Sequence, residues 1–213
     1  MKKLEAAYAR ALLEDPEKAR QLRLLLDLRT ALYQRNADAA RRLLAELEDE
    51  ALKQAVGDLL AGRYAPYLEA EPAFLAAEAW VQKGVEAAAS GDLDMAEAAF
   101  NRALTLDEKH PRAHMNLGNV YLERGGMEAA KAAYDRALAL APDLADLHEN
   151  LAAYYKKKGQ IDAMVRHLKR AQRLRLYPAA GRRAAGVPPI YARFWFWLLL
   201  AGLLYLFLHG RGG

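Results

Sequence analysis

Apolar and polar side chains in the first 76 residues follow the amphipathic pattern of helices. This pattern predicts three or four helices. Asp15 followed by Pro16 indicates a helix start, because aspartate caps free N–H groups and proline fits the first helical position. Residues 36–38 indicate a turn between two helices, and glycine and proline residues between 62 and 72 interrupt the pattern. We therefore expect residues 1–76 to form an irregular helical region that continues or caps the helices after it.

The middle of the chain repeats with a period of 34 residues, in the segments 77–110, 111–144 and 145–178. Each copy places a small residue where two helices of a hairpin would approach, and a large residue that would fill the space beside it. These pairs are Gly84 and Phe100, Gly118 and Tyr134, and Ala152 and Leu168. A glycine between the two helices supplies a permissive backbone. These glycines are Gly91, Gly125 and Gly159.

This pattern resembles the tetratricopeptide repeat family over residues 77–178. The second copy carries the clearest match, in Leu117-Gly118, Tyr121, Gly125, Ala130, Tyr134, Ala137 and Pro142. The resemblance implies an all-α fold, a solenoid of stacked helical hairpins, since one hairpin alone exposes an apolar face. No obvious polar helix follows the third copy to cover its last apolar face. Glu108 and Leu176 also replace the terminal proline of the family in the outer copies.

The C-terminus carries a long apolar stretch. Phe194 to Leu208 are 15 consecutive uncharged residues, and residues 190–209 give 20 residues that span about 30 Å as a helix. We expect residues 190–209 to form one transmembrane helix, with Arg193 reaching the headgroups and residues 179–189 as a linker. The alternative is a terminal helix that docks into a partner protein of a soluble assembly.

Charge is divided unevenly along the chain. Residues 1–155 hold 19 Lys and Arg against 26 Asp and Glu, whereas residues 156–193 hold 11 basic residues and one acid. A basic flank before a transmembrane helix predicts that the N-terminal body is cytoplasmic. We assign contact with an anionic lipid surface to Arg166, Lys169, Arg170, Arg173, Arg182, Arg183 and Arg193. Nucleic acid is the weaker alternative because aromatic residues are not interleaved with these charges, and an acidic protein partner is another.

No catalytic or metal-binding pattern is apparent in the sequence. There is no cysteine, no Gly-rich phosphate loop, and no pair of histidines one helical turn apart among the five histidines. His114 and His148 recur at one repeat position, which favours a packing role. We therefore predict that the chain is not an enzyme and holds neither a cofactor nor a metal.

The family resemblance implies a binding groove instead, lined by the first helix of each repeat and able to take extended or helical peptides. By repeat position, the groove would present Val81, Val85, Arg112, Met115, Asn119, Leu122, Glu123, Asp146, Glu149, Ala153, Lys156 and Lys157. Val81 and Val85 stand where some members place a lysine and an asparagine that clamp a terminal carboxylate, so that clamp is absent.

Together these features predict a protein–protein interaction scaffold, anchored to a membrane by its C-terminus. Its role would be that of an accessory subunit or assembly factor of a membrane complex, with a membrane-associated protein as partner. A soluble adaptor whose terminal helix docks into a partner, and a nucleic-acid binder, remain as alternatives.

Overall fold

The computed structural model describes residues 2–47 and 49–176, and every regular element in this part is helical. The chain divides into two units, residues 1–173 and 174–213. The predicted linker 179–189, the predicted membrane helix 190–209, and Arg182, Arg183 and Arg193 lie outside the described residues. Within the described part, none of the helices is both long and apolar enough to cross a membrane.

The N-terminal region forms four α-helices and a 3-10 turn, which agrees with the three or four helices expected. They are α1 (Lys2–Glu14), α2 (Pro16–Tyr33), α3 (Ala37–Ala45), α4 (Glu50–Leu60) and the 3-10 turn Ala65–Tyr67. The Asp15 side chain accepts a hydrogen bond from the Lys18 N–H, so the predicted cap before Pro16 is confirmed. Asn36 caps α3 in the same way through the Ala39 N–H.

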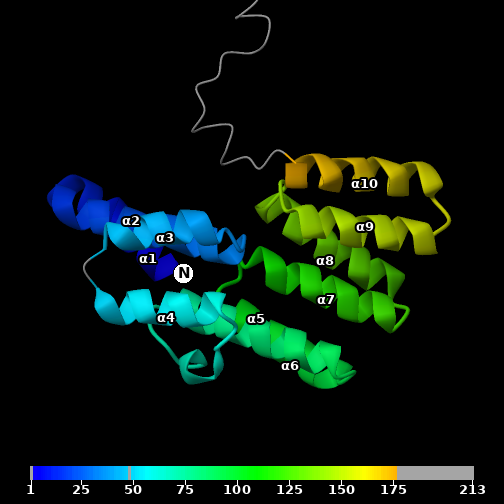
Figure 1. Ribbon diagram of the computed structural model, residues 1–213, viewed down its shortest axis with the longest axis horizontal. Coiled ribbons are helices and arrows are strands. Elements are labelled where there is room, and N and C mark those ends of the chain that lie inside the picture. Colours follow the sequence, from blue (N-terminus) through cyan, green and yellow to red (C-terminus); the bar gives the residue numbers. More distant parts are fainter. Residues whose placement is uncertain (1, 48, 177–213) are drawn as a thin grey trace, which may run out of the picture. The chain divides into compact units, whose positions relative to one another are not determined.

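Six helices follow as three hairpins (Figure 1). They are α5 (Ala73–Ala89) with α6 (Leu93–Leu106), α7 (Pro111–Glu123) with α8 (Met127–Leu140), and α9 (Ala145–Lys157) with α10 (Ile161–Leu176). The expected turn glycines Gly91, Gly125 and Gly159 all have positive φ, between 75° and 85°, a conformation in which glycine escapes the penalty of a Cβ atom. Helix α5 begins before residue 77, where the first repeat was expected to start.

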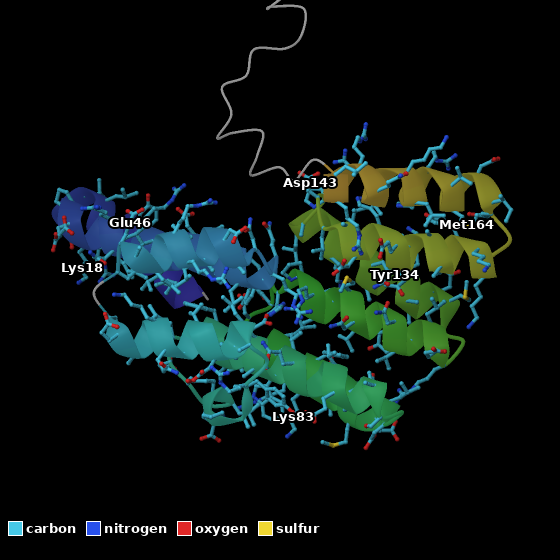
Figure 2. The ribbon with its side chains drawn as sticks, in the orientation of Figure 1. Lys18, Glu46, Lys83, Tyr134, Asp143 and Met164 are labelled. Carbon is cyan, nitrogen blue, oxygen red and sulfur yellow. The ribbon has the colours of Figure 1, made fainter. Side chains whose placement is uncertain are left out.

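The first two hairpins are closed by the predicted contact of a glycine with a ring. A Cβ atom added to Gly84 would lie 2.5 Å from the Phe100 ring, and one added to Gly118 would lie 2.5 Å from the Tyr134 ring. Both rings are almost fully buried, and Tyr134, which Figure 2 labels, belongs to α8. The third hairpin differs. Leu168 is 46% exposed, so the expectation that it fills the hairpin interior is wrong, because no described helix packs beyond α10.

A buried polar network joins α2 to the first two hairpins. The Tyr33 hydroxyl donates to the Asp107 carboxylate at 2.8 Å, and the Tyr33 ring stacks on the His110 ring at 3.7 Å between centroids. His110 Nε2 in turn lies 3.2 Å from Glu78 Oε2. Burial raises the pKa of Tyr33 well above its usual value and lowers the pKa of His110, so both are neutral near pH 7.

Glu78 and Arg112 form a buried ion pair between α5 and α7. Arg112 donates to Glu78 Oε1 at 2.6 Å, and the two residues are only 4% and 1% exposed. Burial opposes ionisation of Glu78, but the Arg112 charge and the His110 ring outweigh it and lower the pKa of this carboxyl to about 2. The pair therefore ties the first hairpin to the second.

Candidate functional site: a groove along α5 and α7

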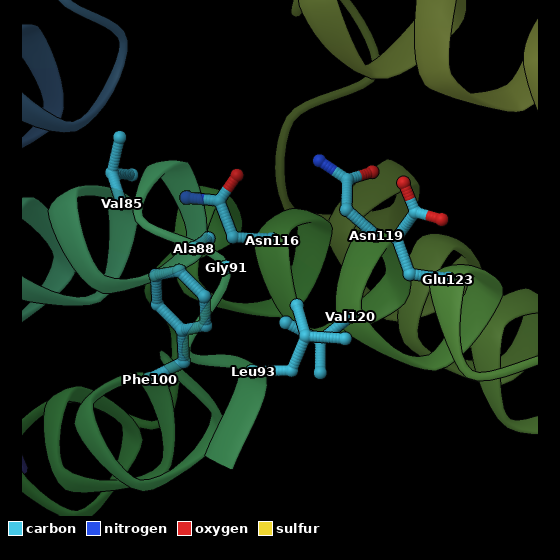
Figure 3. A pocket seen from close by; sticks show the side chains of 9 residues that line it. All are labelled: Val85, Ala88, Gly91, Leu93, Phe100, Asn116, Asn119, Val120 and Glu123. Carbon is cyan, nitrogen blue, oxygen red and sulfur yellow. The ribbon is translucent and has the colours of Figure 1, made fainter. Parts of the chain in front are cut away.

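Two adjoining recesses open beside α5 and α7 and share Val85 and Asn116 as lining residues. The first has a volume of about 480 Å³ and extends along α7 to Glu123 (Figure 3). The second has a volume of about 510 Å³ and extends toward Arg35, Tyr64 and Asp146. Because the two recesses share lining residues, we describe them as one open groove and name it the α5/α7 groove.

Polar side chains of α7 line the first recess at helical spacing. Asn116, Asn119 and Glu123 are three and four residues apart, so one face of α7 carries all of them. The Tyr134 hydroxyl donates to Asn119 Oδ1 at 2.7 Å, which fixes this amide and leaves its NH₂ group to donate to another acceptor. Asn116 is 9% exposed and lines both recesses. Two amides are thus placed where they could bind the backbone of an extended peptide.

The second recess is lined from five parts of the chain, which include the segment after α4 and the start of α9. Gln82 and Glu86 come from α5, Met115 comes from α7, and Arg35 comes from the turn between α2 and α3. Gln82 is held by donating to the Leu59 carbonyl at 2.8 Å, and Glu86 accepts from the Tyr64 hydroxyl. The hydrogen bond to Glu86 raises the pKa of Tyr64, so this phenol stays protonated.

The structure places the twelve predicted groove residues unevenly. Six of them line the two recesses, and these are Val85, Arg112, Met115, Asn119, Glu123 and Asp146. The remaining six do not: Val81, Leu122, Glu149, Ala153, Lys156 and Lys157. Lys157 instead donates to the Leu122 carbonyl at 2.8 Å. Whether any of the twelve contacts a partner stays a prediction.

Two of the predicted groove residues have other roles in this structure. Val81 is fully buried in a cluster with Ala113 and Leu117, because it faces the neighbouring helix α7 rather than the groove. Arg112 is buried and its guanidinium is held by Glu78, so its charge is already compensated. Val81 therefore offers no surface to a ligand, and Arg112 offers little.

Sequence reasoning missed several groove residues that the fold brings in. Asn116 lies one helical turn before Asn119, and that spacing was a signal in the sequence that both amides share a face. Arg35, Tyr64 and Glu86 gave no such signal, since their place beside α7 depends on how the N-terminal helices pack.

The groove has an acidic rim. Glu86, Glu123 and Asp146 line it, and Arg35 is the one basic residue in the lining besides the compensated Arg112. Glu123 and Asp146 are exposed to solvent. The electrostatic field of the groove therefore favours a ligand with basic side chains.

Two of the described histidines make the same structural contact. His114 Nε2 lies 3.0 Å from the Glu108 carbonyl and His148 Nε2 lies 3.0 Å from the Pro142 carbonyl, which is the same contact in two successive repeats. His148 also meets His167 of α10, with 3.0 Å between the two Nδ1 atoms, and Tyr155 stacks on the His167 ring. Among the described residues, no group of three or more potential metal ligands is found.

The predicted lipid-facing residues that the structure describes all lie on α10. Arg166, Lys169 and Arg173 are exposed, while Arg170 bonds to Asp143 in the loop before α9. Three of the four therefore face solvent on α10, whereas Arg170 is half-buried against the loop before α9.

Comparison with known proteins supports the repeat assignment. A tetratricopeptide repeat family model matches residues 81–145, which run from the middle of α5 to the first residue of α9. Residues 81–145 are thus similar to tetratricopeptide repeats, and every regular element in the described part of the chain is helical. No curated protein matches the chain.

Several solved structures are similar to the chain. A crystal structure of MamA is 22% identical, with a TM-score of 0.42 over 63% of this chain and 86% of that one. A second crystal structure of MamA protein is 20% identical, with a TM-score of 0.42 over 78% of this chain and 96% of that one. A structure of MamA AMB-1 is 18% identical, with a TM-score of 0.41 over 79% and 100% of the two chains.

Proposed function

We propose that the chain is a non-catalytic scaffold that binds an extended segment of a partner protein in the α5/α7 groove. One observation carries the proposal: an open groove with two amides, Asn116 and Asn119, on its floor and carboxylates along its rim. Tetratricopeptide repeats are typically interaction modules without catalytic groups. Amide side chains can bind peptide backbone of any sequence, so the rim charges would select the ligand.

The charge of the rim indicates a basic ligand. Glu86, Glu123 and Asp146 would pair with Lys or Arg side chains of the bound segment, and the apolar Val85 and Met115 would contact its aliphatic parts. An acidic segment would be repelled by these carboxylates and would bind weakly.

We expect the full chain, purified in detergent, to bind basic peptides in preference to acidic ones on an array of peptides grouped by net charge. The double change Glu123→Gln and Asp146→Asn should weaken binding of a fluorescent basic peptide about fivefold by anisotropy, since exposed charge pairs contribute roughly 0.2–1 kcal/mol each. Raising the salt concentration should reduce the difference between the variant and the native chain.

The matched control is the double change Glu17→Gln and Glu128→Gln. Both carboxylates are exposed and lie outside the two recesses, so this control removes the same net charge from another surface. Equal weakening by both double changes would show a general charge effect and would refute binding in the groove.

We further propose that the scaffold is tethered to a membrane and acts as an accessory subunit or assembly factor there, with its repeats on the cytoplasmic side. In this arrangement residues 1–76 precede the repeats at 77–178, residues 179–189 link them to the membrane, and residues 190–209 cross it. The apolar run from Phe194 to Leu208 and the basic residues before it support this proposal. A tether would raise the effective concentration of the groove for membrane-bound partners.

Fractionation tests the tether. The full chain should stay in the membrane pellet after carbonate washing, whereas a chain that ends at Pro189 should appear in the supernatant. If both forms are soluble, residues 190–209 dock into a protein, and the soluble-adaptor hypothesis replaces the membrane tether while leaving the groove proposal untouched.

A further inference from the structure

The solvent-facing side of α10 carries an apolar stripe. Ile161, Val165 and Leu168 are 54%, 37% and 46% exposed, and their spacing of four and three residues aligns them along one face. The opposite face packs inward, where Ala163 and Ala171 are buried and His167 contacts Tyr155 and His148. The stripe is therefore an outer surface of the third hairpin, and no described helix covers it.

Basic residues flank this stripe along one side. Successive residues of a helix are 100° apart around its axis. In this angular order the cations next to Val165 are Lys169, Arg173 and Arg166, and all three are exposed. They make no ion pair with any described residue. Arg170 is partly compensated by Asp143, and Asp162 is the one acid on the helix. An exposed apolar stripe bordered by uncompensated cations is typical of helices that lie in a membrane interface.

We infer that the outer face of α10 binds the surface of an anionic phospholipid membrane, with Ile161, Val165 and Leu168 below the headgroups and the flanking cations on the phosphates. Charge complementarity favours this occupant, and the apolar stripe disfavours nucleic acid, which would leave it uncovered.

The inference rests on the proposed tether in one respect, the proximity of α10 to the bilayer. Residues 177–189 are 13 residues and reach at most about 45 Å, so an inserted segment 190–209 would keep α10 near the headgroups. At that distance a helix face of weak intrinsic affinity is bound most of the time, because its effective concentration at the surface is high.

The absence of cysteine in the chain allows a direct test. Val165→Cys in the full chain would carry an environment-sensitive NBD label, and the protein would be placed in lipid nanodiscs. Discs with roughly 30% phosphatidylglycerol should give a blue shift and about a twofold rise in NBD emission over discs of phosphatidylcholine alone. Nitroxide lipids should quench the label. Arg41→Cys on α3, whose side chain is 71% exposed, is the matched control and should show neither effect.

Charge reversal separates lipid binding from simple proximity. Arg166→Glu, Lys169→Glu and Arg173→Glu together should abolish the emission change at position 165 while the protein stays in the discs. The labelled chain without the charge reversals could instead give the same NBD emission in anionic discs as in phosphatidylcholine discs. That result would overturn the α10 inference but would not contradict the tether.

Failure of the tether gives a different result. If the chain does not enter discs, the labelled protein is added to preformed phosphatidylglycerol vesicles, where the α10 inference still requires a salt-sensitive blue shift. A shift with duplex DNA but not with vesicles would assign the face to nucleic acid and refute lipid binding.

Discussion

Replacing Arg112 by methionine should lower the free energy of unfolding by about 3–5 kcal/mol, because the change leaves the Glu78 carboxylate buried without its cation. Glu78 is only 1% exposed, so water cannot take the place of the guanidinium. Burial lowers the pKa of the neighbouring His110 ring, so in the native chain the positive charge beside this carboxylate comes from Arg112. The measurement is urea unfolding followed by circular dichroism at pH 7.5.

The double change Glu78→Leu and Arg112→Met is the control for this prediction. Removing both charges and keeping similar volume should restore most of the lost stability, since buried pairs and apolar replacements are often close in free energy. A loss below about 1 kcal/mol in Arg112→Met alone would show that the pair is solvated in solution and would contradict its role at the junction of the hairpins.

A second large effect is expected at Gly118. The change Gly118→Val should lower the free energy of unfolding by about 2–3 kcal/mol, because the new side chain overlaps the Tyr134 ring. A Cβ atom alone would lie 2.5 Å from that ring. The ring cannot move aside easily, since it is fully buried and its hydroxyl is bonded to Asn119.

Gly57 of α4 provides the matched control for Gly118. It also lies within a helix, but a Cβ atom added there would meet nothing within 4 Å. Gly57→Val should therefore change the free energy of unfolding by less than about 0.5 kcal/mol, or raise it slightly, because valine exceeds glycine in helix propensity. Similar losses at the two sites would mean that close helix approach does not explain the glycine at Gly118.

Much of the fold follows from local sequence signals. Asp15 predicted a helix start because a cap is a contact within four residues, and the turn glycines predicted a permissive backbone for the same local reason. The turn predicted at residues 36–38 is shorter than expected, because Asn36 caps α3 and the helix begins at Ala37. The pairing of Gly118 with Tyr134 was also predictable, because the two residues belong to one hairpin and recur as Gly84 and Phe100 in the hairpin before it.

The groove was predicted only in part, because its shape depends on contacts between distant segments. The repeat position of Val81 and Arg112 suggested the concave side, but each faces a neighbouring helix and is buried there. The partners Tyr33 and Asp107 are 74 residues apart, and no periodic pattern connects them. The exposure of Leu168 was missed for a related reason, since it depends on what packs beyond α10.

The two kinds of contact between helices place different limits on lengthening the chain by a duplicated hairpin. The glycine and ring contacts lie inside single hairpins, so a duplicated hairpin would bring its own copy of each. The Glu78–Arg112 pair joins residues 34 positions apart, the length of one repeat. A hairpin inserted after His110 would separate these two residues. Each would then be buried against a residue of the inserted hairpin. One inserted hairpin offers a single residue at this repeat position, and that residue cannot be both an arginine for Glu78 and a glutamate for Arg112, so the insertion would leave a buried charge unpaired. By this reasoning the ion pair makes the order of the first two hairpins specific.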